Sequence, residues 1–85
     1  MSDFDYVMVM YDISSDKIRT RVAARCADYG LRRIQYSVFL GFLNASHRGV
    51  LEENLRDELG EEGGRIVVLG LPDRVMGDMT FMLNE

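Results

Sequence analysis

One carboxylate, Asp12, stands where a continuous apolar segment gives way to the signals of a helix start. Residues 6–10 contain no charged residue and no polar alternation, which is typical of a β-strand covered on both faces. Ser14 and Ser15 follow, and serine is a favoured helix N-cap. A carboxylate at a rigid strand end could bind a metal ion or act as an acid or base. A structural role as a helix N-cap or a turn residue is the alternative, because Asp is favoured at both positions.

Cationic side chains are concentrated in the middle of a chain that is acidic overall. The net charge is −4, but residues 17–48 carry seven Lys and Arg against one Asp. Six of the seven are arginine, whose planar guanidinium suits bidentate contact with a phosphate. The segment predicts either a phosphate-binding surface or a solvated basic helix face, and the acidic ends of the chain hide it from the total charge.

Length and composition describe one small globular domain. The 85 residues are 47% hydrophobic and 28% charged, which is ordinary for a soluble protein. A domain of this size buries a modest share of its surface, so oligomerisation would add stability. No apolar run approaches the roughly 20 residues of a membrane span, and the acidic N-terminus is unlike a secretory signal. The single cysteine, Cys26, cannot form an internal disulfide, which favours a cytoplasmic protein with Cys26 in the core.

The hydrophobic periodicity predicts two helices separated by strands. Apolar residues recur at helical spacing at Ile18, Val22, Cys26 and Tyr29, and again at Leu51, Leu55 and Leu59. Gly30 and Gly60 are natural helix ends, and Asn44 or Ser46 is expected to cap the second helix. Residues 33–43 are rich in strand formers but long for one strand, so we expect a reversal near Ser37.

The resulting order is strand, helix, strand, strand, helix, strand, which is the βαββαβ arrangement of an α+β, ferredoxin-like domain. The domain spans residues 1–85, with a core of about 5–71 and an apolar C-terminal extension at 72–85. Within the extension, residues 79–83 are expected to form a short strand or an apolar tail. Because both helices of this fold cover one face of the sheet, we expect a partner's sheet to cover the other face in a sheet-to-sheet homodimer. The extension is expected to pack on the partner subunit.

Phe39 interrupts the more polar face of residues 33–41. An aromatic ring beside Arg33 could stack on a base, as in proteins that bind single strands. The alternative is a place in the sheet core, which is the commoner position of phenylalanine. Gly41, on the same face, would permit the close approach of another backbone segment. Arg19 and Arg21 lie about 200° apart around a helix, so they would serve different surfaces of one subunit.

Two segments together resemble the CRISPR-associated Cas-two family. They are YDIS at residues 11–14, followed by Asp16, Lys17, Arg19 and Arg21, and YGLRRIQYSVF at residues 29–39. The likeness is strong over residues 6–43 and rests on general pattern beyond them. The resemblance implies a ferredoxin-like homodimer that acts in spacer acquisition (CRISPR adaptation) with the CRISPR integrase (Cas-one). It also implies binding of DNA or RNA and, as in many members, metal-dependent endonuclease activity.

The same resemblance implies roles for individual residues. Asp12 would be catalytic and a metal ligand, paired across the dimer axis with its twin, and Tyr11 would be catalytic beside it. The nucleic-acid-binding residues would be Arg19, Arg21, Arg33 and Phe39. Two Asp12 carboxylates at a two-fold axis would repel each other unless a cation lies between them, and an oxygen site of this kind suits Mg²⁺ or Mn²⁺.

Three functions stay open on the sequence. The chain could be a metal-dependent endonuclease that hydrolyses phosphodiester bonds, or a non-catalytic scaffold that positions DNA for the integrase. The third is a dimeric regulatory domain that binds a metabolite between its subunits, and the basic segment 17–48 argues against it. The low Lys and Arg content after residue 48 favours nucleic-acid binding with a partner over tight binding by the dimer alone.

Overall fold

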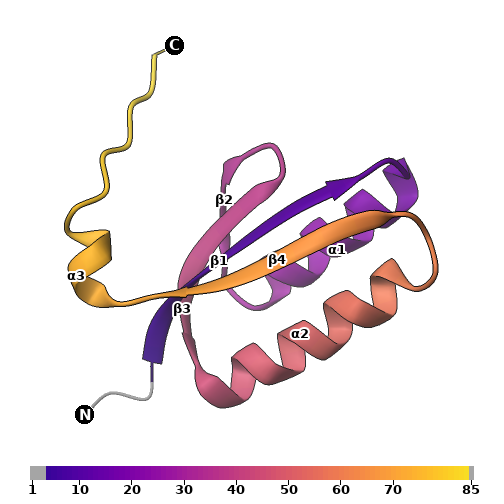
Figure 1. Cartoon of the computed structure of the whole chain (residues 1–85), viewed down its shortest axis with the longest axis horizontal. Coiled ribbons are helices and arrows are strands. Elements are labelled where there is room, and N and C mark those ends of the chain that lie inside the picture. Colours follow the sequence, from indigo (N-terminus) through magenta and orange to yellow (C-terminus); the bar gives the residue numbers. More distant parts are fainter. Residues whose placement is uncertain (1–3, 85) are drawn as a thin grey trace.

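The computed structural model describes residues 4–84 and contains one antiparallel sheet with two long helices packed on one side (Figure 1). The elements are β1 (Phe4–Ile13), α1 (Asp16–Asp28), β2 (Arg32–Gln35), β3 (Val38–Asn44), α2 (Ala45–Leu59), β4 (Gly64–Leu71) and α3 (Asp73–Met76). The strand order is β2-β3-β1-β4, and β1 runs antiparallel to both of its neighbours. This confirms the predicted α+β, ferredoxin-like arrangement.

Helix α1 begins and ends where the sequence predicts. The Ser15 Oγ accepts a hydrogen bond from the Ile18 backbone N–H at 3.3 Å, which identifies Ser15 as the N-cap. Asp16 in the first turn complements the positive end of the helix dipole. The chain leaves the helix through Gly30 at φ 81°, a conformation that glycine adopts without strain. The predicted apolar line is confirmed, since the buried residues of α1 are Ile18, Val22 and Cys26.

Helix α2 begins at a predicted cap and is tied to α1. The Asn44 Oδ1 accepts a hydrogen bond from the His47 backbone N–H at 2.7 Å, so Asn44, rather than Ser46, is the N-cap. Toward the other end of α2, the Arg25 Nε of α1 donates to the Glu58 Oε2 at 2.9 Å. No helix within residues 4–84 has both the length and the apolar character needed to cross a membrane.

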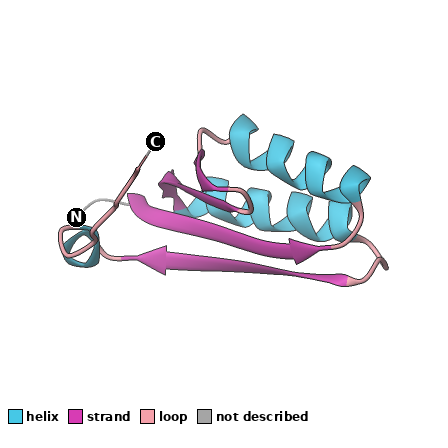
Figure 2. Ribbon diagram, turned by 90° about the horizontal axis from the view of Figure 1, so that it is seen from above, coloured by secondary structure: helices cyan, strands magenta, loops and turns pink. Residues whose placement is uncertain are grey.

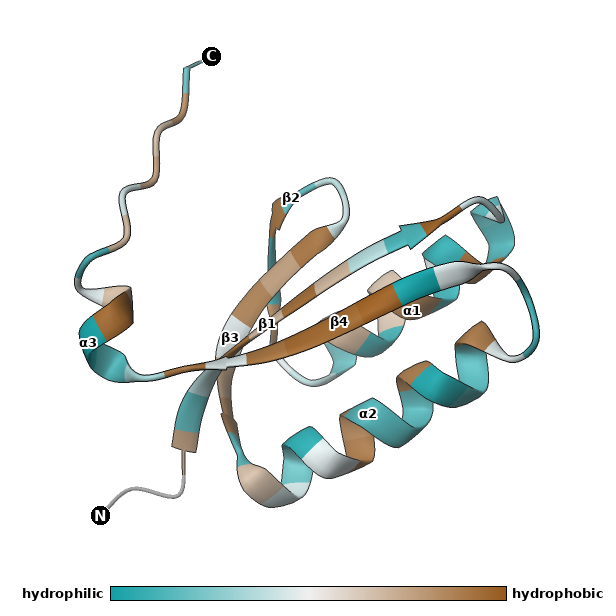
Figure 3. Ribbon diagram, viewed as in Figure 1, coloured by the Kyte–Doolittle hydropathy of each residue, from teal (hydrophilic) through white to brown (hydrophobic). Residues whose placement is uncertain are grey.

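The two faces of the sheet differ because successive side chains of a strand point to opposite sides. Val7 and Val9 of β1 face the helices and are fully buried. We call the other side the open face; its apolar side chains, matched by the strand register, are Tyr6, Met8, Met10, Val38, Leu40, Phe42, Val67, Leu69 and Leu71. No element of the described chain covers this side (Figure 2). The middle of β4 is strongly hydrophobic, and β3 and β1 are hydrophobic over part of their length (Figure 3). The predicted uncovered apolar face is therefore present.

The predicted reversal near Ser37 is confirmed by a turn at Tyr36 and Ser37 that joins β2 to β3. Gly41 of β3 allows the close backbone approach that the sequence suggested. A Cβ at this position would collide with the Leu31 side chain and lie 3.0 Å from the Leu31 Cα. The loop that follows α1 therefore passes over β3 at a position where only glycine fits without displacement.

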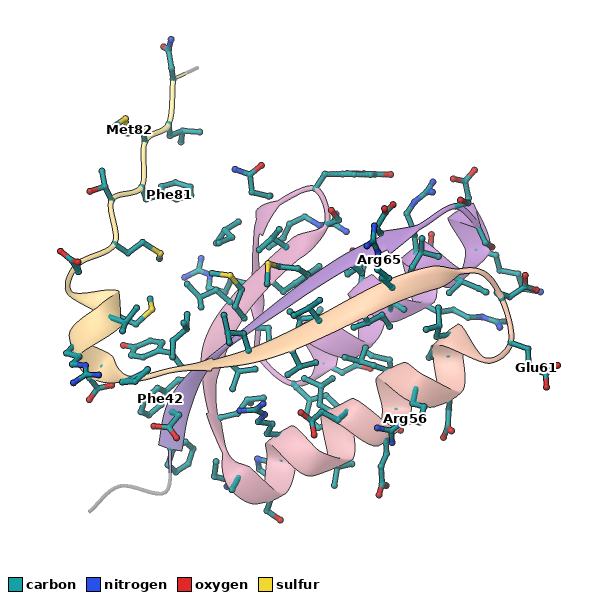
Figure 4. All side chains as sticks on the ribbon, in the orientation of Figure 1. Phe42, Arg56, Glu61, Arg65, Phe81 and Met82 are labelled. Atoms are coloured by element: carbon teal, nitrogen blue, oxygen red, sulfur yellow. The ribbon has the colours of Figure 1, made fainter. Side chains whose placement is uncertain are left out.

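Beyond β4 the chain turns through α3 and then runs away from the sheet (Figure 1). Residues 79–84 contain neither helix nor strand. Of the two predicted alternatives for residues 79–83, the structure therefore shows the apolar tail and not the short strand. Phe81 and Met82 in this tail are exposed (Figure 4). Residues 1–3 and 85, which belong to the predicted domain and extension, lie outside the described part of the chain.

Cys26 is a core residue, as predicted, and we expect its thiol to be unreactive at neutral pH. Burial raises the pKa of the thiol from 9.0 to about 11, although the positive charge of Arg33 acts in the opposite direction. A raised pKa means that the neutral thiol stabilises the folded state up to about pH 9 and that this contribution is lost as the pH rises toward 11. Iodoacetamide should leave the native protein unmodified and alkylate it in urea. Rapid alkylation of the native protein would contradict the buried position.

Candidate functional site

Asp12 lies at the end of β1 and on the open face. It is the register partner of Arg65 in β4, whose Nη2 donates to the Asp12 Oδ2 at 3.5 Å. The two side chains are 81% and 80% exposed, so the pair contributes little to stability. Because Asp12 is part of the strand and Ser15 caps α1, the alternative of a cap or turn residue does not apply to Asp12. Arg65 and Phe42 mark opposite ends of the open face (Figure 4).

One subunit supplies few ligands for a metal ion around Asp12. The shallow hollow at this end of the sheet is lined by Asp12, Ser14, Ser15, Glu62, Gly63, Gly64 and Arg65. Within residues 4–84, no three His, Cys, Asp or Glu side chains gather closely enough to hold a metal. The carboxylate oxygens of Asp12 are hard ligands of the type that Mg²⁺ prefers. The predicted two-Asp12 site therefore requires a second copy of the chain that brings its own Asp12 close to the first.

Arg19 is engaged with the loop that follows Asp12. Its Nη1 donates to the backbone oxygens of Ile13 at 2.8 Å and Ser14 at 2.9 Å, and its Nη2 pairs with the Asp16 carboxylate. Its Nε is buried without a hydrogen-bond partner in the described chain. The family resemblance implies that Arg19 binds nucleic acid, but in this structure its guanidinium holds the backbone between β1 and α1. This makes Arg19 a positioning residue in the isolated subunit.

Replacing Arg19 with alanine should lower the free energy of unfolding by about 1.5–3 kcal/mol, because two carbonyls lose a charged donor. Arg21→Ala is the matched control. Arg21 is exposed and has no ion pair within residues 4–84, so its loss should change stability by less than about 0.5 kcal/mol. Urea denaturation of both variants measures the difference. Equal stabilities would contradict the structural role of Arg19.

Tyr11 and Phe39 both face the helices. Their side chains are in the core, with Tyr11 7% and Phe39 4% exposed, and the two rings stack with centroids 6.4 Å apart. Tyr11 and Asp12 are consecutive in a strand, so their side chains lie on opposite sides of the sheet. The structure thus separates the predicted catalytic pair. It also supports the core alternative for Phe39, whose ring is closed to a nucleic-acid base in this subunit.

Arg33 has the placement that best suits a phosphate contact. It lies on the edge strand β2, and its Cζ is 5.1 Å from the ring centroid of Phe39 and 5.7 Å from that of Tyr36. These cation–π contacts orient the guanidinium and leave its N–H groups available. Arg33 forms no ion pair with a carboxylate within residues 4–84. Phe39 therefore supports the Arg33 guanidinium from the core instead of exposing its own ring.

The fold neutralises part of the basic segment 17–48. Three of its arginines pair with carboxylates, namely Arg19, Arg25 and Arg48. In the described chain, the cations of the segment that have no ion pair are Lys17, Arg21, Arg32 and Arg33. The free positive charge is thus divided between α1 and the edge strand β2.

Two residues of interest were not found by sequence reasoning. Arg65 comes opposite Asp12 only through the register of β4 against β1, and no local pattern in the sequence shows that register. Tyr36 lies next to the reversal predicted at Ser37, but the sequence assigned it no role. A register irregularity between Arg33 and Gln35 precedes it, and it lies in the turn with its side chain 70% exposed.

A family model described as CRISPR associated protein Cas2 matches residues 5–79. A protein named CRISPR-associated endoribonuclease Cas2 from Desulforudis audaxviator is 37% identical over 67 residues, which cover 79% of this chain and 63% of that protein. One named CRISPR-associated endoribonuclease Cas2 2 from Chloroflexus aurantiacus is 54% identical over 44 residues, or 52% of each chain. The matches thus span less than two thirds of the length of these two relatives.

The fold is also found among solved structures. The crystal structure of Streptococcus pyogenes Cas2 superimposes with a TM-score of 0.78, covering 91% of this chain and 98% of that one. At 24% sequence identity, this likeness concerns the fold alone.

Proposed function

Because this chain belongs to the CRISPR-associated protein Cas2 family, we propose that it acts in CRISPR adaptation as a cytoplasmic homodimer that binds nucleic acid and works with the CRISPR integrase. We further propose that it hydrolyses phosphodiester bonds with a divalent ion held at Asp12. The observation that carries this proposal is the exposed Asp12 carboxylate at the end of a central strand, on the uncovered side of the sheet. Since the relatives are named endoribonucleases, single-stranded RNA is the first substrate to test.

Dimerisation through the open face is supported by its composition. Its exposed apolar side chains include Phe42, Val67 and Leu69, and contiguous patches of this kind mark interaction surfaces. The molecule measures 36 × 36 × 18 Å, so it has the thickness of one sheet and one helix layer. A second copy related by a two-fold axis would bury the same residues on both subunits. The apolar tail with Phe81 and Met82 would then pack on the partner subunit.

The chemistry at Asp12 follows from the donors that each copy offers. The two Asp12 carboxylates would hold Mg²⁺ or Mn²⁺ through oxygen atoms. When bound, the ion would supply a positive charge that polarises a phosphate oxygen. Arg65 would place a guanidinium beside the same carboxylate. Arg21 and Arg33, both without carboxylate partners in the described chain, would bind the sugar–phosphate backbone elsewhere on the subunit.

A non-catalytic scaffold that positions DNA for the integrase is the second candidate function. The sparse ligand set favours it, because one carboxylate per subunit makes a weak metal site. The third possibility considered from the sequence, a dimeric domain that binds a metabolite, has no comparable support from the family.

The test is a cleavage assay on the purified dimer. Single-stranded RNA and double-stranded DNA are incubated with Mg²⁺, Mn²⁺ or EDTA over a pH series. Cutting that needs the metal supports the endonuclease. Cutting that persists equally in EDTA contradicts a role for a metal at Asp12. If neither substrate is cut, but DNA is held when the integrase is added, the scaffold is the correct function.

A further inference from the structure

A groove of about 830 Å³ lies between α1 and the β2–β3 hairpin, on the helix side of the sheet. Helix α1 contributes small side chains to it, including Ala23, Ala24 and Ala27. The hairpin side contributes Arg33, Tyr36 and Phe39. The helix wall of the groove is therefore apolar at these alanines and polar nearer the start of α1, where Asp16, Arg19 and Thr20 line it. Aromatic rings and a cation line its other wall. The groove is separate from the hollow at Asp12, which opens at the end of β1 and β4.

Tyr36 is the aromatic residue of this groove that a ligand can reach. Its side chain is largely exposed, whereas Tyr11 and Phe39 are buried. It follows the register irregularity of β2, and such irregularities redirect side chains at sheet edges. The Arg33 guanidinium lies over its ring, which restricts the position of both side chains. A ring that is exposed and held in this way can serve as a stacking platform.

Charge selects the kind of ligand that would use this platform. Arg19 also lines the groove, but its guanidinium is already paired with Asp16 and bonded to backbone oxygens. Arg33 has no carboxylate partner in residues 4–84, so an anionic group beside Tyr36 would find a free cation. A nucleotide within a strand supplies both features, since its base has an aromatic face and its phosphate is negative.

We infer that Tyr36 stacks on an unpaired base of a single-stranded nucleic acid whose adjacent phosphate is bound by Arg33. This contact rests on the proposed nucleic-acid-binding function and extends it to a residue with no role assigned from sequence. The bases of a regular duplex are already stacked and paired, so they cannot use the platform. The Tyr36 contact should consequently favour single strands, or unpaired ends, over fully paired duplexes.

The experiment compares the affinities of wild type, Tyr36→Ala and Tyr36→Phe for a labelled single-stranded RNA and a fully paired DNA duplex at low ionic strength. Tyr36→Ala should weaken single-strand binding by about fivefold to a hundredfold, the range for loss of one base–aromatic stack. Tyr36→Phe should retain affinity within about twofold, because it keeps the ring. Binding of the duplex should be the same for all three proteins. Since Tyr36 is exposed, urea denaturation should show equal stabilities.

Each other outcome has a defined meaning. Unchanged single-strand affinity in Tyr36→Ala would overturn the inference and leave the proposed function in place. An equal loss for single strand and duplex would also overturn it, because that result indicates a general effect on binding. Absence of binding by wild type to both nucleic acids, with and without the integrase, would overturn the proposed function together with the inference.

Discussion

Replacing Asp12 with alanine is expected to reduce metal-dependent cleavage to the level seen in EDTA, while the fold remains intact. The variant removes from each subunit the Asp12 carboxylate that is proposed to hold the ion. Neither of the two proposed ligands then remains in the dimer. The Asp12–Arg65 pair is highly exposed, and its loss should change the free energy of unfolding by less than about 1 kcal/mol. Cleavage rates and urea denaturation of the same preparation separate the two effects.

Asp57→Ala is the matched control for this experiment. Asp57 is an exposed aspartate of α2 with no ion pair in the described chain, and its replacement alters the net charge by the same amount. It should cut like wild type. If Asp12→Ala also cuts like wild type, the activity does not depend on Asp12 or comes from a contaminant. If wild type does not cut and Asp12→Ala still supports spacer integration, Asp12 has no catalytic role and the protein is a scaffold.

Replacing Leu69 with glutamate is expected to convert the proposed dimer into a monomer. Leu69 lies opposite Met8 near the middle of the open face and is 45% exposed in the single subunit. The substitution would remove the apolar surface that Leu69 buries at the interface in both copies. Two charged glutamates would also have to enter an apolar contact. The combined cost is about 3 kcal/mol or more, which weakens association by about a hundredfold or more. Sedimentation or light scattering over a concentration series measures the change.

Val50→Glu provides the comparison for Leu69→Glu. Val50 is 46% exposed, nearly the same as Leu69, but it belongs to α2 on the other side of the sheet. It should remain as dimeric as wild type. A dimer that survives Leu69→Glu but is broken by Val50→Glu would show that the helices, rather than the open face, form the interface.

The local sequence patterns predicted the elements well because each depends on neighbouring residues. Helix α1 needs only its Ser15 cap, its apolar line and Gly30, and all three lie within 16 consecutive residues. The uncovered apolar face could also be predicted, because residues 6–10 contain no charged side chain and no polar alternation. What the patterns could not show was the register between distant strands, which brings Arg65 to Asp12.

The candidate site was harder to predict because a motif lists residue types without their orientation. Tyr11 and Asp12 are adjacent in the motif but point to opposite sides of β1. Arg19 has the chemistry of a phosphate ligand, yet its guanidinium donates to the carbonyls of Ile13 and Ser14 and pairs with the Asp16 carboxylate. Phe39 matches a stacking aromatic by type, but its register with Arg33 places it in the core below the guanidinium.

The alternation along β1 implies that substitutions in this strand have two independent kinds of consequence. Val7, Val9 and Tyr11 are constrained by the folding of each single chain, so changes in their size should be harmful under any condition. Met8 and Met10 lie on the open face, so changes there should be tolerated whenever assembly is not required. An insertion of one residue in the middle of β1 would reverse the faces of the residues on one side of it and so disturb both properties at once.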